Sequence, residues 1–176
     1  MKYPCFEEPQ KKATLIFNRK ELIYDASNCS FVESDVMPDE ESHRKHQIAD
    51  IAQAGNIDRV TRVLNTSFAE CVEMLYPHTK EEISDETEVF DDKLEEPEQY
   101  EINLILPQSF SKTTLKLLKS LIHDYLVCCV LADWMGLTNN PQSQQKWIIK
   151  SQDLETKIRV AMTRRRKRIR RPLNPF

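Results

Sequence analysis

The scarcity of glycine constrains the fold of this chain more than any other feature of its sequence. Among 176 residues there are only two glycines, Gly55 and Gly136. Phosphate-binding loops, nucleophile elbows and dinucleotide-binding turns need glycine, because their backbones approach a ligand closely or take positive φ angles. Two isolated glycines build none of these motifs. The scarcity therefore argues against the common nucleotide-dependent enzymes and favours a helical protein.

The spacing of apolar residues predicts a body of four helices. Two of them are expected at residues 39–53 and 57–76, the second with a clear amphipathic stripe. A longer helix at 112–135 becomes apolar nearly all round over 125–132, as a central helix of a bundle does, and Gly136 is its expected stop. The last helix begins at "NP" and carries one apolar seam, formed by Trp147, Ser151, Leu154, Ile158 and Ala161.

Residues 13–33 predict an N-terminal β-hairpin. The run "ATLIF" is rich in strand formers, "NRKE" suits a turn, and "LIYDASNCSFV" is expected to continue in an extended or bent form. A two-stranded ribbon is barely stable alone, so it must pack on other elements. The run "INLILP" at 102–107 predicts a further short strand that pairs with this hairpin.

Charge is distributed very unevenly along the chain. Residues 157–176 carry nine basic side chains and no acidic one, whereas the other 156 residues hold 16 Lys and Arg and all 28 Asp and Glu, a net charge of −12. Residues 80–101 alone contain eleven acids and two lysines, which is typical of a solvated linker or arm. The overall charge of −3 therefore conceals a dipolar molecule.

Together these patterns predict a mainly α (α+β) fold: a helical bundle with an N-terminal β-hairpin, an acidic linker and an extended basic C-terminal arm. The expected parts are a hairpin region (1–38), a helical part of the bundle (39–79), the acidic linker (80–101), a strand with two long helices (102–162) and the arm (163–176).

No residue pattern indicates a catalytic, metal or cofactor site, and we expect a non-enzymatic protein without a cofactor. His43 and His46 share a helical face with Asp50, but no further ligand lies nearby in the sequence. His123 is expected to form local hydrogen bonds, and Trp134 and Trp147 are expected to pack near the turn between the last two helices. The five cysteines are odd in number and form no C-x-x-C pair, which indicates free thiols in a reducing cytosol.

The first residues, "MKYPCFEEPQKK", have no apolar signal-peptide core, and the longest apolar run is too short to cross a bilayer. We therefore expect a protein that stays in the compartment where it is made, without a membrane partner.

The C-terminal arm "TRRRKRIRRPLNPF" is the strongest functional signal, and three interpretations are open. It is a solvated helix end, or a phosphate-binding element for DNA or RNA, or a clamp for protein assembly. In the assembly interpretation the cations dock on an acidic surface of an identical or different subunit, and "PLNPF" provides an apolar hook. The 80–101 stretch is such an acidic surface, and pairing within one chain or between chains is open. The docking residues are then Arg164, Arg165, Arg166, Lys167, Arg168, Arg170 and Arg171, and the apolar anchors are Leu173 and Phe176.

The order of elements resembles one known class of protein. A short β-element, the helix "LKLLKSLIHDYLVCCVLADWMGLT", a last amphipathic helix and a basic, proline-ended arm make the chain similar to the connector and completion proteins of tailed bacteriophages. The resemblance implies a bundle formed by residues 39–76 and 111–162, no catalytic residues, and an arm that locks a ring between portal and tail. It implies a virion neck or tail component, with portal, tail or identical subunits as partners; otherwise we expect a cytoplasmic protein. The alternative is a nucleic-acid-binding accessory protein that uses the same arginines.

Overall fold

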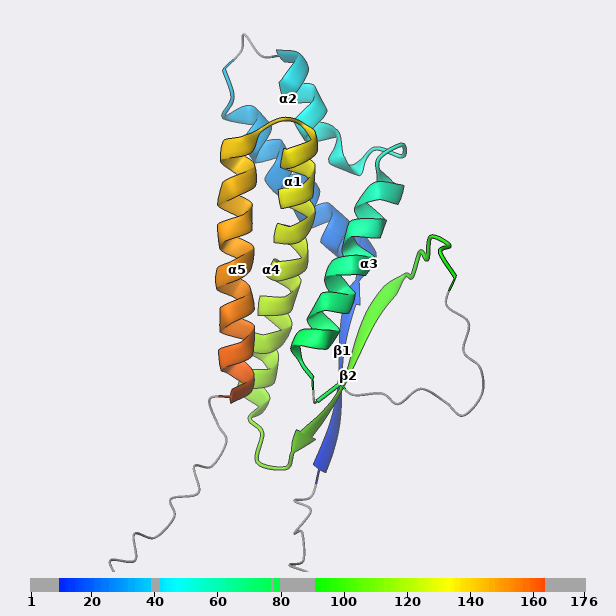
Figure 1. Ribbon diagram of the computed structural model, residues 1–176, viewed down its shortest axis with the longest axis vertical. Helices are drawn as coiled ribbons and strands as arrows, with labels where there is room; N and C mark the ends of the chain where they lie inside the picture. The colour runs from blue at the N-terminus through cyan, green and yellow to red at the C-terminus, as the bar shows by residue number, and fades with distance from the viewer. Residues whose placement is uncertain (1–9, 39–41, 77, 80–90, 164–176) are drawn as a thin grey trace, which may run out of the picture.

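The computed structural model describes residues 10–38, 42–76, 78–79 and 91–163, and these form a mainly helical body with a two-stranded antiparallel sheet (Figure 1). This confirms the predicted fold class. In chain order the elements are β1 (Gln10–Asn18), α1 (Arg19–Asp35), α2 (Ser42–Ala49), the short 3-10 helix η2 (Asp50–Ala52), α3 (Ile57–Met74), β2 (Gln99–Pro107), α4 (Lys112–Leu137) and α5 (Pro141–Thr163).

The β-ribbon joins two segments that lie far apart in the sequence. β1 pairs with β2, so that Leu15 lies opposite Ile102 and Phe17 opposite Tyr100. Side chains alternate along both strands, and one face is buried against the helices. The predicted pairing of the "INLILP" strand with the N-terminal strand is therefore confirmed.

The local hairpin predicted at residues 13–33 is wrong in its second half. Residues 19–35 form the helix α1 instead of a turn followed by an extended segment. The side chain of Asn18 accepts a hydrogen bond from the amide of Lys20 at 3.0 Å, and this cap starts the helix directly after the strand. Strand propensity in "LIYDASNCSFV" is overridden because the distant strand β2 already supplies the partner of β1.

Helix α4 is the central element of the bundle, as its apolar sequence predicts. It packs against α1, α3 and α5, and the side chains of Leu118, Ile122, Leu126 and Leu131 are fully buried. Figure 1 shows α4 and α5 side by side and antiparallel, and α3 also packs against α4. Trp134 is buried and donates a hydrogen bond from Nε1 to the carbonyl oxygen of Ile48 at 2.9 Å, which ties α4 to α2.

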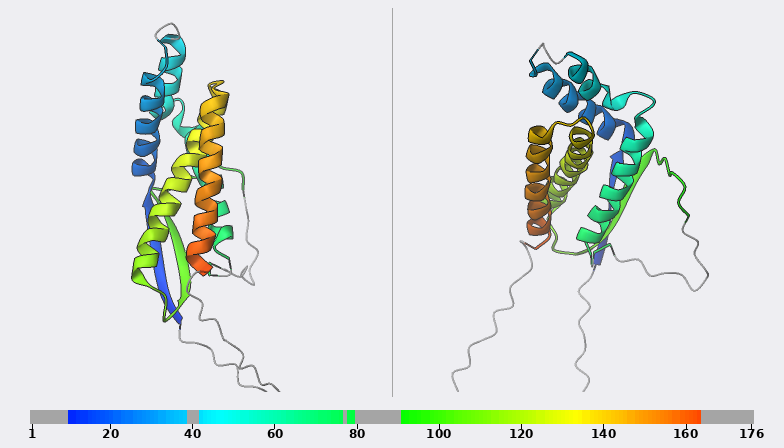
Figure 2. Two further views of the ribbon diagram at one scale, coloured as in Figure 1. Left: turned by 90° about the vertical axis from the view of Figure 1, so that its left-hand side faces the viewer. Right: turned by 45° about the horizontal axis from the view of Figure 1, so that its top comes forward.

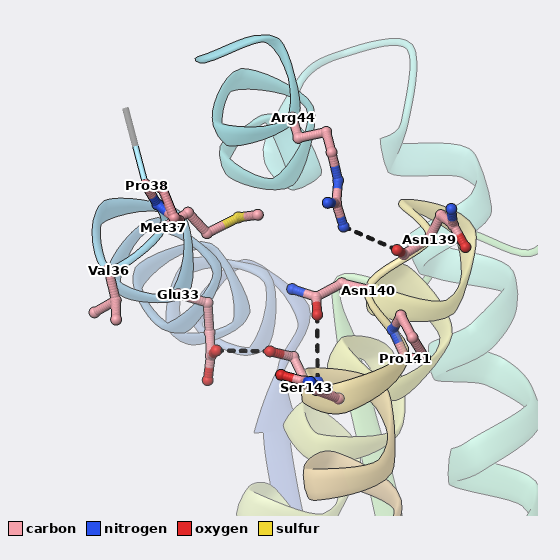
Figure 3. Close-up of a pocket in the computed structure, with 10 residues that line it drawn as sticks. Glu33, Val36, Met37, Pro38, Arg44, Asn139, Asn140, Pro141 and Ser143 are labelled. Carbon is pink, nitrogen blue, oxygen red and sulfur yellow. Dashed lines mark hydrogen bonds between the residues drawn. The ribbon is translucent and has the colours of Figure 1, made fainter. Parts of the chain in front are cut away.

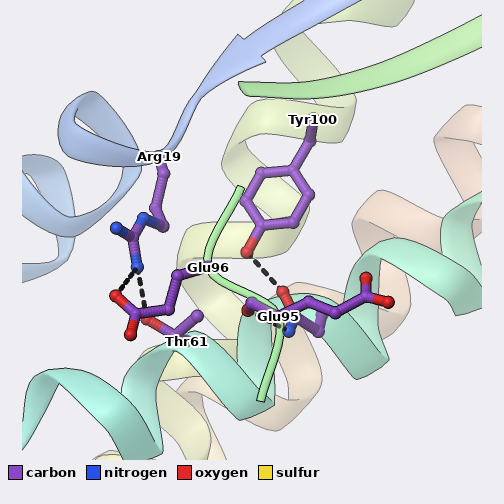
Figure 4. Close-up of polar contacts among 6 residues, drawn as sticks. Arg19, Thr61, Glu95, Glu96 and Tyr100 are labelled. Atoms are coloured by element: carbon purple, nitrogen blue, oxygen red, sulfur yellow. Dashed lines mark hydrogen bonds and ion pairs between the residues drawn. The ribbon is translucent and has the colours of Figure 1, made fainter. Parts of the chain in front are cut away.

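Two predicted boundaries differ from the structure. Strand β2 begins at Gln99, inside the predicted acidic linker, and Tyr100 is buried. Figure 4 shows why this end of the acidic segment is fixed: Arg19 Nη1 binds Glu96 Oε2 at 3.1 Å, and the Tyr100 hydroxyl donates to Asn65 Oδ1 at 2.6 Å. One of its acids, Glu96, is thus paired with the first residue of α1.

Helix α4 runs through Gly136, which was predicted to stop it, and ends at Leu137. A Cβ atom at Gly136 would lie 2.4 Å from Nε2 of Gln144, so the Gln144 side chain of α5 occupies the space that a larger residue would fill. The left-handed turn that follows is taken by Asn139, whose φ is 55°.

Candidate assembly surface

The residues predicted to bind partners, Arg164 to Arg171 together with Leu173 and Phe176, lie outside the described residues. The described chain ends at Thr163, the last residue of α5. The structure therefore describes the helix that precedes the arm, and the roles of the arm residues stay predictions.

Helix α5, which precedes the arm, packs against α4 through an apolar seam. Of the five residues of the predicted seam, Trp147, Leu154, Ile158 and Ala161 are buried and Ser151 is half-buried, which confirms the seam. Near its end, Arg159 binds Glu155 through Nε and Nη2 at 3.0 and 2.9 Å, a pair with the spacing of one helical turn. Arg159 therefore has a carboxylate partner within α5.

Helix α1 has an unusual distribution of apolar side chains. Its buried side consists of Leu22, Ala26, Ser30 and Ser34, of which the two serines are polar and Ala26 is small. Ser30 Oγ donates a hydrogen bond to the carbonyl oxygen of Ile48, so this small residue lets α1 approach α2 and η2 closely. Of the larger apolar side chains of α1, Leu22 is fully buried, whereas Tyr24, Phe31 and Val32 lie on the opposite side, in solvent.

We call this exposed side the α1 face; it comprises Glu21, Tyr24, Asn28, Phe31, Val32 and Asp35. Tyr24 is 65% exposed, Phe31 63% and Val32 61%. The steps from Glu21 through Tyr24, Asn28 and Phe31 to Asp35 are three, four, three and four residues, the spacing of a helix-packing seam, and Val32 lies next to Phe31. All six residues are exposed, so no described element covers them; in the left view of Figure 2, α1 lies at the outer edge of the helices. Clustered exposed apolar residues mark interaction surfaces more often than isolated ones do.

The α1 face has an acidic residue at each end. Glu21 and Asp35 form no salt bridge with any other residue in the described part of the chain. The face therefore combines an apolar centre with two exposed carboxylates about 21 Å apart along the helix, at 1.5 Å per residue.

A hollow of about 550 Å³ borders the C-terminal end of α1 (Figure 3). Val36 and Met37 form its apolar side, and Val36 is 82% exposed. On the other side, the turn between α4 and α5 is fixed by Arg44 Nη2, which donates to the carbonyl oxygen of Asn139 at 2.9 Å. Ser143 Oγ donates to Glu33 Oε2 at 2.9 Å, which places the C-terminal part of α1 beside the first turn of α5.

A smaller cavity of about 220 Å³ lies between α1, α4 and α5, and it is lined by several polar side chains and two cysteines. His123 Nε2 and Asp25 Oδ2 are 2.8 Å apart across it, so His123 forms its hydrogen bond to α1. Burial raises the pKa of Cys29, and raises that of Cys128 to about 11, so both thiols are neutral at physiological pH. A thiol is nucleophilic as the thiolate, and these two are therefore poorly reactive.

Within the described residues, no group of three or more His, Cys, Asp and Glu side chains could hold a metal ion. No helix among residues 10–38, 42–76 and 91–163 is long and apolar enough to cross a membrane. Comparison with family models, with curated proteins and with solved structures gives no match. The resemblance to phage connector proteins thus stays a prediction.

The α1 face was missed at the sequence level, although its signal is present. Glu21, Tyr24, Asn28, Phe31 and Asp35 already have helical spacing in the sequence. The aromatic and β-branched residues in this segment favoured a strand, and strand alternation would have split these positions between two faces.

Proposed function

We propose that the protein is a non-enzymatic structural subunit that binds neighbouring subunits through its C-terminal arm. The resemblance to connector and completion proteins supports placing it in the neck or tail of a phage virion. The partners are then identical subunits or portal and tail proteins.

The observation that carries this proposal is the exposed apolar α1 face. Tyr24 and Phe31 are each more than 60% exposed, while the buried side of the same helix consists of Leu22, Ala26 and two serines. Exposed aromatic side chains in a contiguous patch are typical anchors of protein interfaces. A chain that offers both such a face and a cationic arm has two of the elements that subunit assembly requires.

The second candidate is a nucleic-acid-binding accessory protein, favoured by the seven arginine and lysine residues between Arg164 and Arg171. The surface near the end of α5 opposes it, because the groove beside Tyr125 is lined by Glu70, Glu73 and Glu155. These carboxylates would repel a phosphate backbone close to the arm. The apolar α1 face also has no role in phosphate binding.

Native mass spectrometry of the full chain, purified without nuclease, distinguishes these two functions. The assembly proposal predicts a defined oligomer free of nucleic acid, which a chain ending at Thr163 no longer forms. A heterogeneous mass with co-purified nucleic acid favours the second candidate. If the oligomer forms equally well without the arm, the proposed role of the arm is refuted.

A further inference from the structure

We propose that the α1 face is the docking site for the C-terminal arm of a second copy of this chain. This inference rests on the proposed function and names the partner of the arm. The contact is heterologous: the arm of one subunit binds α1 of the next, whose own arm binds a third.

The two surfaces are complementary in charge and in apolar character. The arm combines a basic block with two apolar residues, Leu173 and Phe176. The α1 face combines exposed carboxylates at Glu21 and Asp35 with an apolar centre. Steering by opposite charges and anchoring by a few apolar side chains are the usual division of roles at an interface.

The length of the chain favours a second copy over the same copy. Ser143, in the first turn of α5, contacts Glu33 beside Phe31 and Val32, while the arm begins after Thr163. The helix between them is about 30 Å long at 1.5 Å per residue. Leu173 and Phe176 follow Thr163 by ten and thirteen residues, which reach at most about 36 and about 47 Å when fully extended. An arm folding back on its own subunit would use most of this length to reach the start of α5, before it passed around α1 to its outer side.

Among the described residues, the acidic groove near the end of α5 is a competing receptor within one chain, and it has a volume of about 650 Å³. Two of its three acids already have partners, because the Tyr125 hydroxyl donates to Glu70 at 3.1 Å and Glu155 binds Arg159. Its large apolar lining is Met74 and Tyr125, and Tyr125 is only 7% exposed, whereas the α1 face offers two exposed aromatic residues and a valine.

A heterologous contact predicts which defective copies can complement each other. The first variant ends at Thr163, so it lacks the arm and keeps the face. The second is the full chain with Tyr24→Ser and Phe31→Ser, so it keeps the arm and loses the face. Each alone is expected to self-associate at least about 100-fold more weakly than the native chain, since each aromatic anchor contributes about tenfold or more. Mixed together, they are expected to form a one-to-one heterodimer and nothing larger.

The matched control is the full chain with Tyr76→Ser and Ile149→Ser, two residues that are also more than half exposed but lie outside the face. It should assemble like the native chain. Circular dichroism melting of both double variants checks that they fold, which their exposure predicts. Masses are read by native mass spectrometry and sedimentation.

Each outcome bears on the inference. If the native chain assembles through its arm but the two variants form no heterodimer, the α1 face is not the receptor, and the proposed function stands. If the native chain is a monomer, the second copy is not the partner. If removal of the arm leaves the oligomer intact, both proposals fail.

Discussion

Anchoring of the arm-bearing helix depends on the seam between α5 and α4, and the substitution Ile158→Ala tests it. Ile158 is fully buried at this seam. Removing three buried carbons loses about 2.4 kcal/mol at about 0.8 kcal/mol each, and the cavity left behind raises the loss to roughly 3–4 kcal/mol. For a chain of this length, a loss of that size lowers the Tm by about 6–16 °C. Thermal and guanidinium unfolding followed by circular dichroism measures both quantities.

The matched control is Ile149→Ala on the same helix, at a side chain that is 56% exposed. The same chemistry there removes less buried area, and solvent fills the space, so the expected loss is about 1 kcal/mol or less. Equal losses for the two substitutions would refute the placement of the α5 seam. A loss confined to Ile158→Ala supports a rigid base for the arm.

Three further predictions concern single contacts. Tyr100→Phe removes the 2.6 Å hydrogen bond to Asn65 and is expected to lower the free energy of unfolding by about 1 kcal/mol in denaturant titration. Arg59→Ala breaks a bidentate pair with Asp133, but both side chains are partly exposed, so the loss should stay below about 1 kcal/mol and shrink further in high salt. Burial raises the pKa of Cys128 from 9.0 to about 11, so alkylation at pH 8 with peptide mapping should leave it unmodified in the folded chain. Since its thiol ionises earlier in the unfolded state, its contribution to stability should be constant below pH 9 and decline between pH 9 and 11.

The helices could be predicted from the sequence because their signals are local. The seam of α5 and the apolar centre of α4 both follow from residues three and four apart. The helical structure of residues 19–35 could not be predicted in the same way, because it depends on a strand that follows some 80 positions later. Once β2 pairs with β1, the segment after Asn18 is free to become a helix, and its cap and spacing decide its structure.

The two parts of the candidate site, the arm and its proposed receptor, also differ in how far the sequence predicts them. The basic arm is evident from composition alone, since nine basic side chains occur without an acid between residues 157 and 176. The proposed receptor, the α1 face, is not evident from composition, because the exposure of Tyr24 and Phe31 depends on how α1 packs against the bundle. An apolar residue on a helix usually faces the core, and only the structure shows that Tyr24 and Phe31 do not, while Leu22 and three small residues of α1 do.

Photo-crosslinking from the α1 face tests the central claim most directly. A benzophenone amino acid in place of Tyr24 should yield, on irradiation of the full chain, a product that joins two copies. Cleavage after Glu155 releases residues 156–176, which contain no further acid, as one peptide. The account predicts that this peptide is attached to α1 of another copy, and that the same amino acid in place of Tyr76 does not capture it. Capture of any other segment at position 24, or of the arm within a single copy, would contradict the account.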